Sequence, residues 1–240
     1  MNNELQARPQ FRHELKYLIN EADYYGIRSR LMPILSHDIN AENGQYTLRS
    51  LYFDDAWDTA YQEKIMGINT RKKYRIRIYN YSDAAIKLEC KHKIDSYIYK
   101  ESAPLTHAEY DKILANDCAF LLARKEPVCK AFYLDTVQRV LRPRVMVDYE
   151  REPFVHSAGD VRVTFDRDVR AAVLRNDIFD AKLPTLSVLA PGELVMEVKF
   201  TSFLPQLVRE ILPPKASEFV AVSKYVLCFN AACYRSTQEL

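Results

Sequence analysis

Two short segments decide the fold of this chain: Arg75-Ile76-Arg77-Ile78-Tyr79 and Lys87-Leu88-Glu89-Cys90-Lys91. Charged and apolar residues alternate in both, and residues two apart on a β-strand point to the same side of a sheet. The pattern therefore predicts two strands, each with a charged face and an apolar face. Asn80-Tyr81-Ser82-Asp83 between them is typical of a turn, so the pair is predicted to be a β-hairpin with four cations and one carboxylate on one wall.

The composition of the chain sets bounds on its size class and its partners. Its 240 residues fit one large domain over residues 1–240, and 48% apolar with 28% charged residues is ordinary for a globular protein. The net charge is only +2, so any site for a polyanion must be a local concentration of cations, balanced by acids elsewhere. A protein that slides along nucleic acid would be broadly positive, and we therefore expect no nucleic-acid partner.

Cysteine usage and hydropathy bear on the cellular compartment. The five cysteines form no C-x-x-C pair and the polar N-terminus shows no signal-peptide pattern, so we expect a reducing, cytoplasmic setting. No apolar run reaches the roughly 18–20 residues that a membrane-spanning helix needs. The nearest candidate, Phe219 to Tyr234, is interrupted by Lys224 and Asn230. We expect no transmembrane segment, which still leaves room for a membrane-protein partner.

Glycine is scarce, and its placement excludes two common kinds of phosphate site. The five glycines are too far apart to form the G-x-x-x-x-G-K-[ST] loop or the G-x-G-x-x-G turn, in which backbone amides cradle phosphate. If this protein binds phosphate, arginine and lysine side chains must therefore do so.

The remaining segments predict strands and helices that occur in blocks. Alternation predicts further strands near residues 11–19, 46–53, 96–101, 144–150, 161–169 and 195–200. Helical spacing predicts helices near residues 21–35, 107–122, 127–141 and 218–233, with short helices near 57–65 and after Pro205. Asn20, Thr106 with Glu109, and Ser217 are predicted to cap the first, second and fourth of these helices, and Pro143 is predicted to end the third. Because helices do not alternate strictly with strands, the sequence predicts an α+β fold with a mainly antiparallel sheet.

Charged residues gather on one face of these other strands too. On the face opposite their apolar residues, these strands carry Glu14, Lys16, Arg162, Thr164, Asp166, Glu197 and Lys199. One interpretation is a sheet with one face on the core and one face in water, where the charges are solvated. The other is a sheet curled into a barrel whose charged faces line a polar bore, which the abundance of arginine favours. Spacing alone does not decide between them.

Eight short segments follow one another along nearly the whole length of the chain: His13-Glu14-Leu15-Lys16-Tyr17, Leu51-Tyr52-Phe53-Asp54, Tyr74-Arg75-Ile76-Arg77-Ile78-Tyr79, Leu88-Glu89-Cys90-Lys91, Tyr149-Glu150-Arg151-Glu152-Pro153-Phe154, Val161-Arg162-Val163-Thr164-Phe165-Asp166, Met196-Glu197-Val198-Lys199-Phe200 and Val222-Ser223-Lys224-Tyr225. Together they resemble the catalytic domain of the vacuolar transporter chaperone (VTC) polyphosphate polymerases, within the CYTH or triphosphate tunnel metalloenzyme superfamily. The resemblance implies an antiparallel β-barrel tunnel of about eight strands, flanked by helices, whose lining cations hold a triphosphate or polyphosphate.

Carried over position by position, the resemblance also assigns roles to side chains. Catalysis and the orientation of the ATP phosphates fall to Arg75, Arg77, Arg151, Arg162 and Glu197. Phosphate and ATP binding fall to Lys16, Lys91, Lys199, Lys224 and the hydroxyl of Ser223, with Lys64 and Lys87 as further candidates. Glu197 matches the carboxylate that binds a divalent metal, Mn²⁺ or Mg²⁺.

Two positions do not follow the family pattern simply. At the three named positions of the superfamily motif E-x-E-x-K on the first strand, this chain has Arg12, Glu14 and Lys16. A cation thus occupies the position of one of the two metal-binding acids, as in the polymerase branch. Glu14 then either binds metal or pairs with a tunnel cation. Strict alternation places Arg151 on the apolar face of Tyr149. Either that apolar face also lies inside the tunnel, or a bulge redirects Arg151.

The activity that the resemblance implies is transfer of the γ-phosphate of ATP to a growing inorganic polyphosphate chain, with release of ADP. Such a transfer needs positioning and charge stabilisation rather than a covalent nucleophile, and a metal at Glu197 would neutralise developing charge. Two alternatives stay open: a metal-dependent tunnel triphosphatase, and a non-catalytic module that binds polyphosphate. Arg12 favours the polymerase over the hydrolase, and the presence of Glu197 with the four arginines favours an enzyme over the module.

Overall fold

A curled antiparallel sheet organises the computed structural model, which describes residues 11–95, 97–172, 177–213 and 222–236. Its strand order is β1-β10-β8-β7-β3-β4-β5-β6, with β2 on β7 and β9 on β8 outside this path. The strands are β1 (His13–Asn20), β2 (Ser36–His37), β3 (Tyr46–Asp54), β4 (Thr70–Tyr79), β5 (Ser82–Ile94), β6 (Tyr97–Leu105), β7 (Arg142–His156), β8 (Val161–Ala172), β9 (Thr185–Ser187) and β10 (Glu193–Phe200). The helices are α1 (Glu21–Leu31), α2 (Thr59–Ile65), α3 (His107–Leu114), α4 (Pro127–Arg139), α5 (Gln206–Ile211) and α6 (Lys224–Ser236).

The hairpin of β4 and β5 has the two faces that its sequence predicts. The chain turns through Asn80 and Tyr81, whose φ angles of 50° and 57° suit the tight two-residue turn that matches the twist of antiparallel strands. Ile76 and Ile78 are completely buried in the core outside the tunnel. Arg75 and the residues that alternate with these isoleucines point to the other side of the sheet, where the ion pairs described below form.

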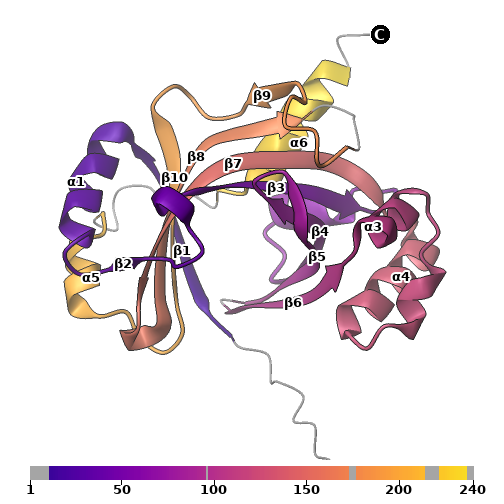
Figure 1. Cartoon of the computed structure of the whole chain (residues 1–240), viewed down its shortest axis with the longest axis horizontal. Helices are drawn as coiled ribbons and strands as arrows, with labels where there is room; N and C mark the ends of the chain where they lie inside the picture. The colour runs from indigo at the N-terminus through magenta and orange to yellow at the C-terminus, as the bar shows by residue number, and fades with distance from the viewer. Residues whose placement is uncertain (1–10, 96, 173–176, 214–221, 237–240) are drawn as a thin grey trace, which may run out of the picture.

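Helices cover the outer, apolar face of the sheet at two ends (Figure 1). At one end α1 and α5 pack on β1, β8 and β10 around Tyr24, Val163 and Met196. At the other, α3 and α4 pack on β3 to β6 around Leu88 and Phe132. Burying a large apolar side chain stabilises a fold by roughly 1.5–3 kcal/mol. The helices therefore fix which face of each strand is outside and leave the charged faces to the inside.

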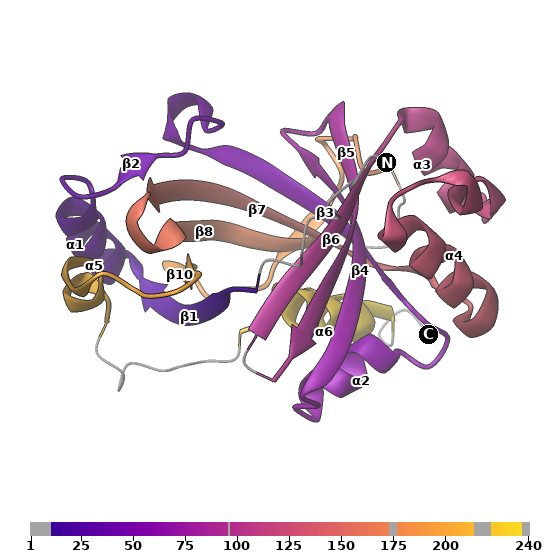
Figure 2. The ribbon, with the colours of Figure 1, turned by 90° about the horizontal axis from the view of Figure 1, so that it is seen from below.

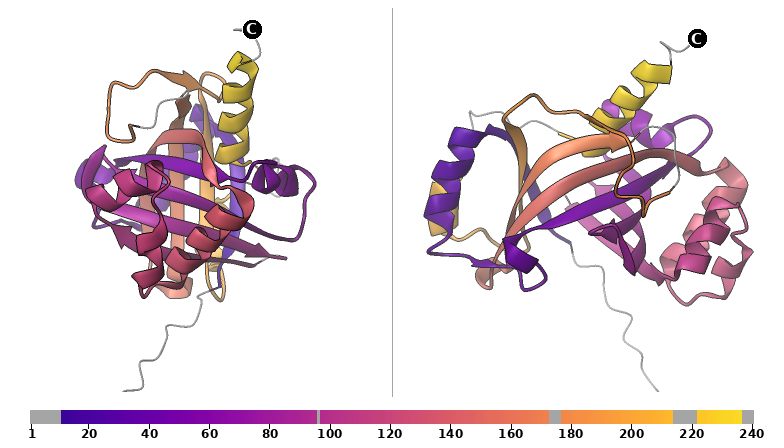
Figure 3. Two further views of the ribbon diagram at one scale, coloured as in Figure 1. Left: turned by 90° about the vertical axis from the view of Figure 1, so that its right-hand side faces the viewer. Right: turned by 45° about the horizontal axis from the view of Figure 1, so that its top comes forward.

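The sheet curls until its edge strands meet (Figures 2 and 3). Backbone hydrogen bonds of 3.0 and 3.2 Å join Arg12, just before β1, to Ile98 on β6. Beyond this bridge, no ladder joins β1 to β6 in the described residues. The predicted α+β fold, an antiparallel tunnel of about eight strands flanked by helices, is confirmed. The edges of its sheet are joined at one bridge in the described residues rather than along a continuous ladder.

Helix α6 fills one end of the bore. Its residues Tyr225, Cys228 and Phe229 pack against Leu48 and Val147, which lie on the inner face of β3 and β7. The inner face is consequently apolar at this end and charged beyond it. None of the helices in the described residues is long and apolar enough to span a membrane.

Strand β7 keeps its alternation from Val145 to Arg151, beyond a register shift against β3 at Arg144, and this places Arg151. Tyr149 and Arg151 both face the bore, with the guanidinium carbon 5.1 Å from the centre of the Tyr149 ring. The register between β7 and β8 shifts just after Asp148, and the extra residue lies on β8, where Asp168 has a φ of 47°. Of the two sequence-based options, the first is therefore correct: the apolar end of that face also lies inside the tunnel, and no bulge redirects Arg151.

The predicted caps of α1 and α3 are correct, but both helices end earlier than predicted. Asn20 and Thr106 each form a capping box with the third helical residue. Helix α1 ends two residues before Pro33, rather than near residue 35, because proline has no N–H with which to continue the helical hydrogen bonds. Helix α3 ends before Asn116, whose φ of 60° is left-handed. A separate 3-10 turn, Ala119–Ala123, forms the rest of the predicted helix.

Two further helix boundaries differ from prediction. Helix α4 ends at Arg139 because Val140 adopts a left-handed φ of 56°. Pro143, which was expected to end this helix, lies inside β7 instead. Helix α6 begins at Lys224 rather than near residue 218. Its predicted cap, Ser217, lies outside the described residues.

Candidate functional site

The inner face of the sheet gathers ionisable side chains from strands far apart in the sequence. The cations are Lys16 (β1), Lys73, Arg75 and Arg77 (β4), Lys87 and Lys91 (β5), Lys100 (β6), Arg151 (β7), Arg162 (β8), Lys199 (β10) and Lys224 (α6). The acids are Glu14 (β1), Glu89 (β5), Asp166 (β8) and Glu197 (β10). Cations outnumber acids, so the bore has positive charge left over for an anion.

Glu197 contacts cations from four elements. Its carboxylate lies 2.9 Å from the ammonium of Lys224 and 3.2 Å from that of Lys199. Lys16 at 3.3 Å and a guanidinium nitrogen of Arg151 at 3.4 Å complete the shell. Burial alone would raise the pKa of Glu197, but these cations, Lys16 foremost, hold the pKa well below its usual value. Glu197 is therefore ionised at neutral pH.

Asp166 orients the guanidinium of Arg151. Two hydrogen bonds, 2.6 and 2.7 Å long, run from Arg151 to its carboxylate, and Lys224 lies 2.5 Å away. Burial would raise the pKa of Asp166, but Arg151 and Lys224 lower it. The sequence places Asp166 on a charged strand face without assigning it a role. Its position directly opposite Arg151 in the ladder is the signal that identifies it.

Glu14 pairs with tunnel cations. Its carboxylate lies 3.0 Å from Lys16 and 2.8 Å from Lys91. Burial works to raise the pKa of Glu14, but Lys16, Lys91 and Lys199 together lower it. Lys16 bridges Glu14 to Glu197, and its own pKa, which burial would lower, is raised by these two carboxylates. Glu14 and Glu197 thus form one connected network.

Glu89 organises the opposite wall. Its buried carboxylate lies 2.7 Å from Arg75, 2.5 Å from Lys100 and 3.9 Å from Arg77. Burial would raise its pKa, but Arg75, Arg77 and Lys100 lower it. Lys100 is absent from the sequence-based set because β6 alternates only weakly. Its pairing with Lys91 across β5 and β6 turns it inward.

Neutral hydroxyl groups hold the remaining arginine donors. Arg75 donates to the hydroxyl of Tyr52 at 3.0 Å, and Arg77 donates to Tyr149 at 3.1 Å and Ser50 at 3.2 Å. The sequence-based reasoning overlooked all three hydroxyls. For Ser50 and Tyr52 the two-residue spacing along β3 is the signal that could have found them.

Lys73 is a further tunnel cation that the sequence-based set omits. Its ammonium lies 4.5 Å from the centre of the Tyr225 ring, and no carboxylate of the described residues pairs with it. Burial lowers the pKa of Lys73 well below its usual value, and Arg71 and Lys16 lower it further. Lys73 lies two residues before Arg75, so extending the alternation backwards would have found it.

Lys64 and Lys87 are the remaining lysines of the predicted set. Lys64 stands on α2, and burial, with Arg71 and Lys16, lowers its pKa. Lys87 lies over the ring of Tyr79 at 5.6 Å. Neither lysine has a carboxylate partner among the residues that the structure describes.

Arg162 and Ser223 are held by local contacts. Arg162 pairs with Asp38 and donates to the hydroxyl of Tyr46 at 3.0 Å. Ser223 precedes α6, and its hydroxyl accepts a 3.5 Å hydrogen bond from the backbone of Val226. It therefore caps the helix that presents Lys224 to the bore.

A family comparison identifies this arrangement. Residues 11–233 match the model of the VTC domain family. The chain belongs to the VTC domain family. The resemblance drawn from the eight sequence segments is thereby confirmed, and the fold is that of the triphosphate tunnel, or CYTH, proteins. No curated protein matches the chain.

Solved structures place the VTC domain in a wider fold group. HpAC1 from Hippeastrum, described as an adenylyl cyclase candidate that reveals a dominant triphosphatase activity, is 12% identical with a TM-score of 0.52, covering 92% of this chain and 95% of that chain. An adenylate cyclase candidate from Bacillus halodurans is 14% identical with a TM-score of 0.49, covering 80% of this chain and 82% of that chain. The likeness to HpAC1 shows a shared fold.

The donor set of this VTC domain fits a hard divalent metal. Glu14 and Glu197 supply ionised oxygen donors, which Mg²⁺ and Mn²⁺ prefer. Mg²⁺ in phosphate sites uses one or two carboxylates and completes its shell with water and phosphate oxygens. Two carboxylates connected through Lys16 match that requirement.

Proposed function

We propose that this VTC domain is a polyphosphate polymerase, which transfers the γ-phosphate of ATP to the end of a growing inorganic polyphosphate chain and releases ADP. The observation that carries the proposal is a bore lined with surplus cations whose arginines are already oriented. Arg75 is held by Glu89 and Arg151 by Asp166. Fixed guanidinium forks suit phosphate oxygens, which they grip two at a time.

Each group of residues has a part in this reaction. Arg75, Arg77, Arg151 and Arg162 would orient the β- and γ-phosphates, because phosphoryl transfer depends on positioning and on stabilising charge on the transferred group. A divalent metal held by Glu197, with Glu14 as the second carboxylate, would neutralise charge on the phosphate oxygens. Lysines such as Lys91 and Lys199 are flexible point charges, which suit a chain that must advance after each addition.

The bore carboxylates favour transfer to phosphate over hydrolysis. A hydrolase that activates its water with a side-chain base works best when that base has a pKa near the working pH. The pKa values of Glu14, Glu89 and Glu197 are all lowered by neighbouring cations against the effect of burial, so these carboxylates are weak bases. Arg12, which stands where hydrolytic members carry an acid, pairs with Asp160 at 3.4 Å.

One assay distinguishes the candidate functions. Purified protein is incubated with ATP and Mn²⁺, and the products are followed by phosphorus NMR. Signals from internal phosphates of a long chain, with ADP, are the expected result. Orthophosphate as the sole phosphate product would instead establish a tunnel triphosphatase, and tight polyphosphate binding without turnover would establish a binding module.

A further inference from the structure

A second group of ligating side chains lies on the outer wall of the tunnel. Cys90 and His92 are two residues apart on β5 and share its outer face, and Glu101 on β6 lies directly opposite Cys90. One potential ligand atom from each side chain, a sulfur, a ring nitrogen and a carboxylate oxygen, lies within 4.8 Å of the others. These atoms are on the opposite side of β5 from Glu89 and Lys91, so the group is separate from the tunnel network.

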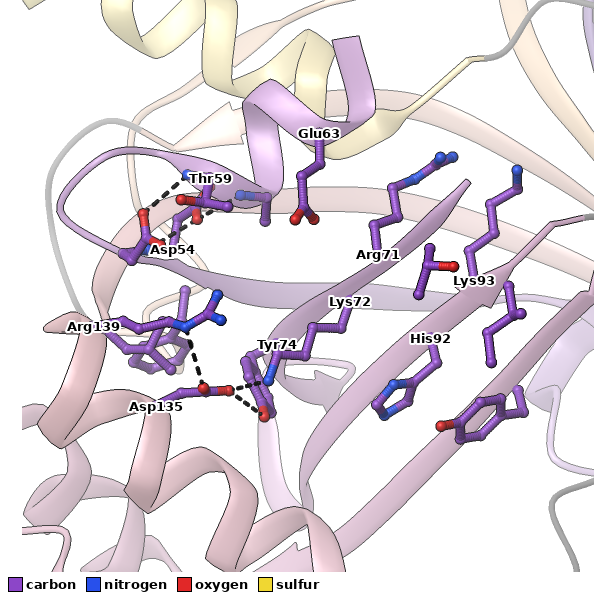
Figure 4. A pocket seen from close by; sticks show the side chains of 17 residues that line it. Asp54, Thr59, Glu63, Arg71, Lys72, Tyr74, His92, Lys93, Asp135 and Arg139 are labelled. Carbon is purple, nitrogen blue, oxygen red and sulfur yellow. Dashed lines mark hydrogen bonds and ion pairs between the residues drawn. The ribbon is translucent and has the colours of Figure 1, made fainter. Parts of the chain in front are cut away.

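The surroundings hold these ligands in place and leave one side open. His92 Nε2 lies 2.8 Å from a carboxylate oxygen of Glu101, and the imidazole stacks on Tyr99 with ring centres 4.4 Å apart. Cys90 is completely buried at the base of the group. His92 also lines a pocket of about 320 Å³ outside the tunnel, into which Glu63 of α2 points from the other side (Figure 4). Ions and water can reach His92 through this pocket.

The donor types determine which ion fits. A thiolate, an imidazole and a carboxylate together suit Zn²⁺ or Co²⁺, whereas Mg²⁺ and Mn²⁺ prefer oxygen donors alone. Zinc bonds to these donors are about 2.0–2.3 Å long, so donor atoms already within 4.8 Å of one another need only small side-chain rotations. Three protein ligands leave one tetrahedral position for water.

We propose that Cys90, His92 and Glu101 form a binding site for Zn²⁺ that pins the edge strand β6 to β5. Strand β6 is the last strand of the sheet path: a ladder pairs it with β5, and in the described residues one backbone bridge joins its other edge to Arg12. The ion would add a side-chain link to the β5–β6 ladder. Lys100, next to Glu101 in sequence, binds Glu89 in the bore at 2.5 Å. The ion therefore stabilises the wall that carries this pair.

Cobalt titration of the full chain tests the site directly. The protein is stripped with a chelator and titrated with Co²⁺, whose bond to a thiolate gives a charge-transfer absorption band. We expect one equivalent of Co²⁺ to produce the band and Zn²⁺ to displace it. His92→Gln and Glu101→Gln should each weaken Co²⁺ binding at least tenfold. Zn²⁺ should also raise the melting temperature of the wild type but not of these variants.

Matched variants separate this site from the other thiols and from the tunnel. Cys233→Ser, at an exposed cysteine, and Glu197→Gln, in the tunnel, should both keep the band. Cys90→Ser removes a buried group and can unfold the chain, so the partly exposed His92 and Glu101 provide the decisive variants. Absence of a thiolate band, or a band of undiminished affinity in both His92→Gln and Glu101→Gln, would overturn the proposal.

Discussion

Arg151 and Asp166 face each other across β7 and β8, and hydrogen bonds of 2.6 and 2.7 Å join the guanidinium to the carboxylate. This bidentate geometry is the one that a guanidinium also uses with phosphate. Lys224 lies 2.5 Å from the same carboxylate. Asp166 therefore fixes two tunnel cations, and in the proposed function an incoming phosphate would meet groups that are already oriented.

Replacing Asp166 with Asn should lower the free energy of unfolding by about 3 kcal/mol, because buried Arg151 and Lys224 lose the charge that compensates them. Tripolyphosphate should then raise the melting temperature of Asp166→Asn more than that of the wild type, since the anion restores the missing charge. Thermal unfolding with and without tripolyphosphate measures both effects. Asp83→Asn, at an exposed pair with His107, should change stability by no more than about 0.5 kcal/mol. An unchanged melting temperature for Asp166→Asn would contradict this account.

The sequence predicts well the features that depend on local periodicity. Alternation along β4 identifies which of Arg75, Ile76 and Arg77 share a face, because this follows from strand geometry alone. The capping boxes at Asn20 and Thr106 are equally local and are correct. Whether a charged face points inward is not local. That direction depends on which face the helices cover, and β4 by itself carries no information about it.

One missed site residue, Lys100, depends on contacts between neighbouring strands. It enters the bore through the register of β6 with β5, which alternation within one strand does not set. The bulge on β8 near Asp168 could not be predicted either, since no glycine marks it. The end of α4 at Val140 is a similar case, because a β-branched residue rarely adopts a left-handed conformation.

Replacing Glu197 with Gln should abolish turnover while leaving tripolyphosphate affinity equal to or tighter than that of the wild type. The variant removes the proposed metal ligand, yet it also frees Lys199 and Lys224 from a competing anion. ADP release and calorimetric binding measure the two effects separately. Glu210→Gln, at an exposed position on α5, should change neither. Full activity of Glu197→Gln would show that the metal assignment is wrong.

Tripolyphosphate binding should take up protons near pH 8. Burial lowers the pKa of Lys91 to about 8; the neighbouring cations Lys16 and Lys199 act in the same direction, and Glu14 acts in the opposite one. Burial also lowers the pKa of Lys73 well below its usual value. A bound anion favours the charged form of both lysines, so protons enter on binding. For the same reason, affinity should fall as the pH rises from about 7 to 9.

Calorimetry in two buffers of different ionisation enthalpy measures this proton uptake. Lys73→Met should reduce the number of protons taken up, whereas Lys130→Met, at an exposed position on α4, should leave it unchanged. Equal binding heats in the two buffers would rule out the coupling.

Asp54 connects the end of β3 to two helices. Its carboxylate accepts hydrogen bonds from the backbone of Ala60 and Tyr61 in α2, at 2.9 and 3.0 Å, and from the hydroxyl of Tyr225 in α6, at 2.6 Å. The hydroxyl of Tyr225 is thus the group through which β3 fixes the start of α6, next to Lys224.

Replacing Tyr225 with Phe should lower the free energy of unfolding by about 1–3 kcal/mol, because a buried carboxylate loses one of its donors. The change should also weaken tripolyphosphate binding by about 2- to 10-fold, since Lys224, the next residue, loses part of its positioning. Chemical unfolding and calorimetry measure the two quantities. Tyr25→Phe, at an exposed ring on α1, is the matched control and should match the wild type in both. If Tyr225→Phe loses stability but keeps full affinity, α6 supports the fold without positioning Lys224.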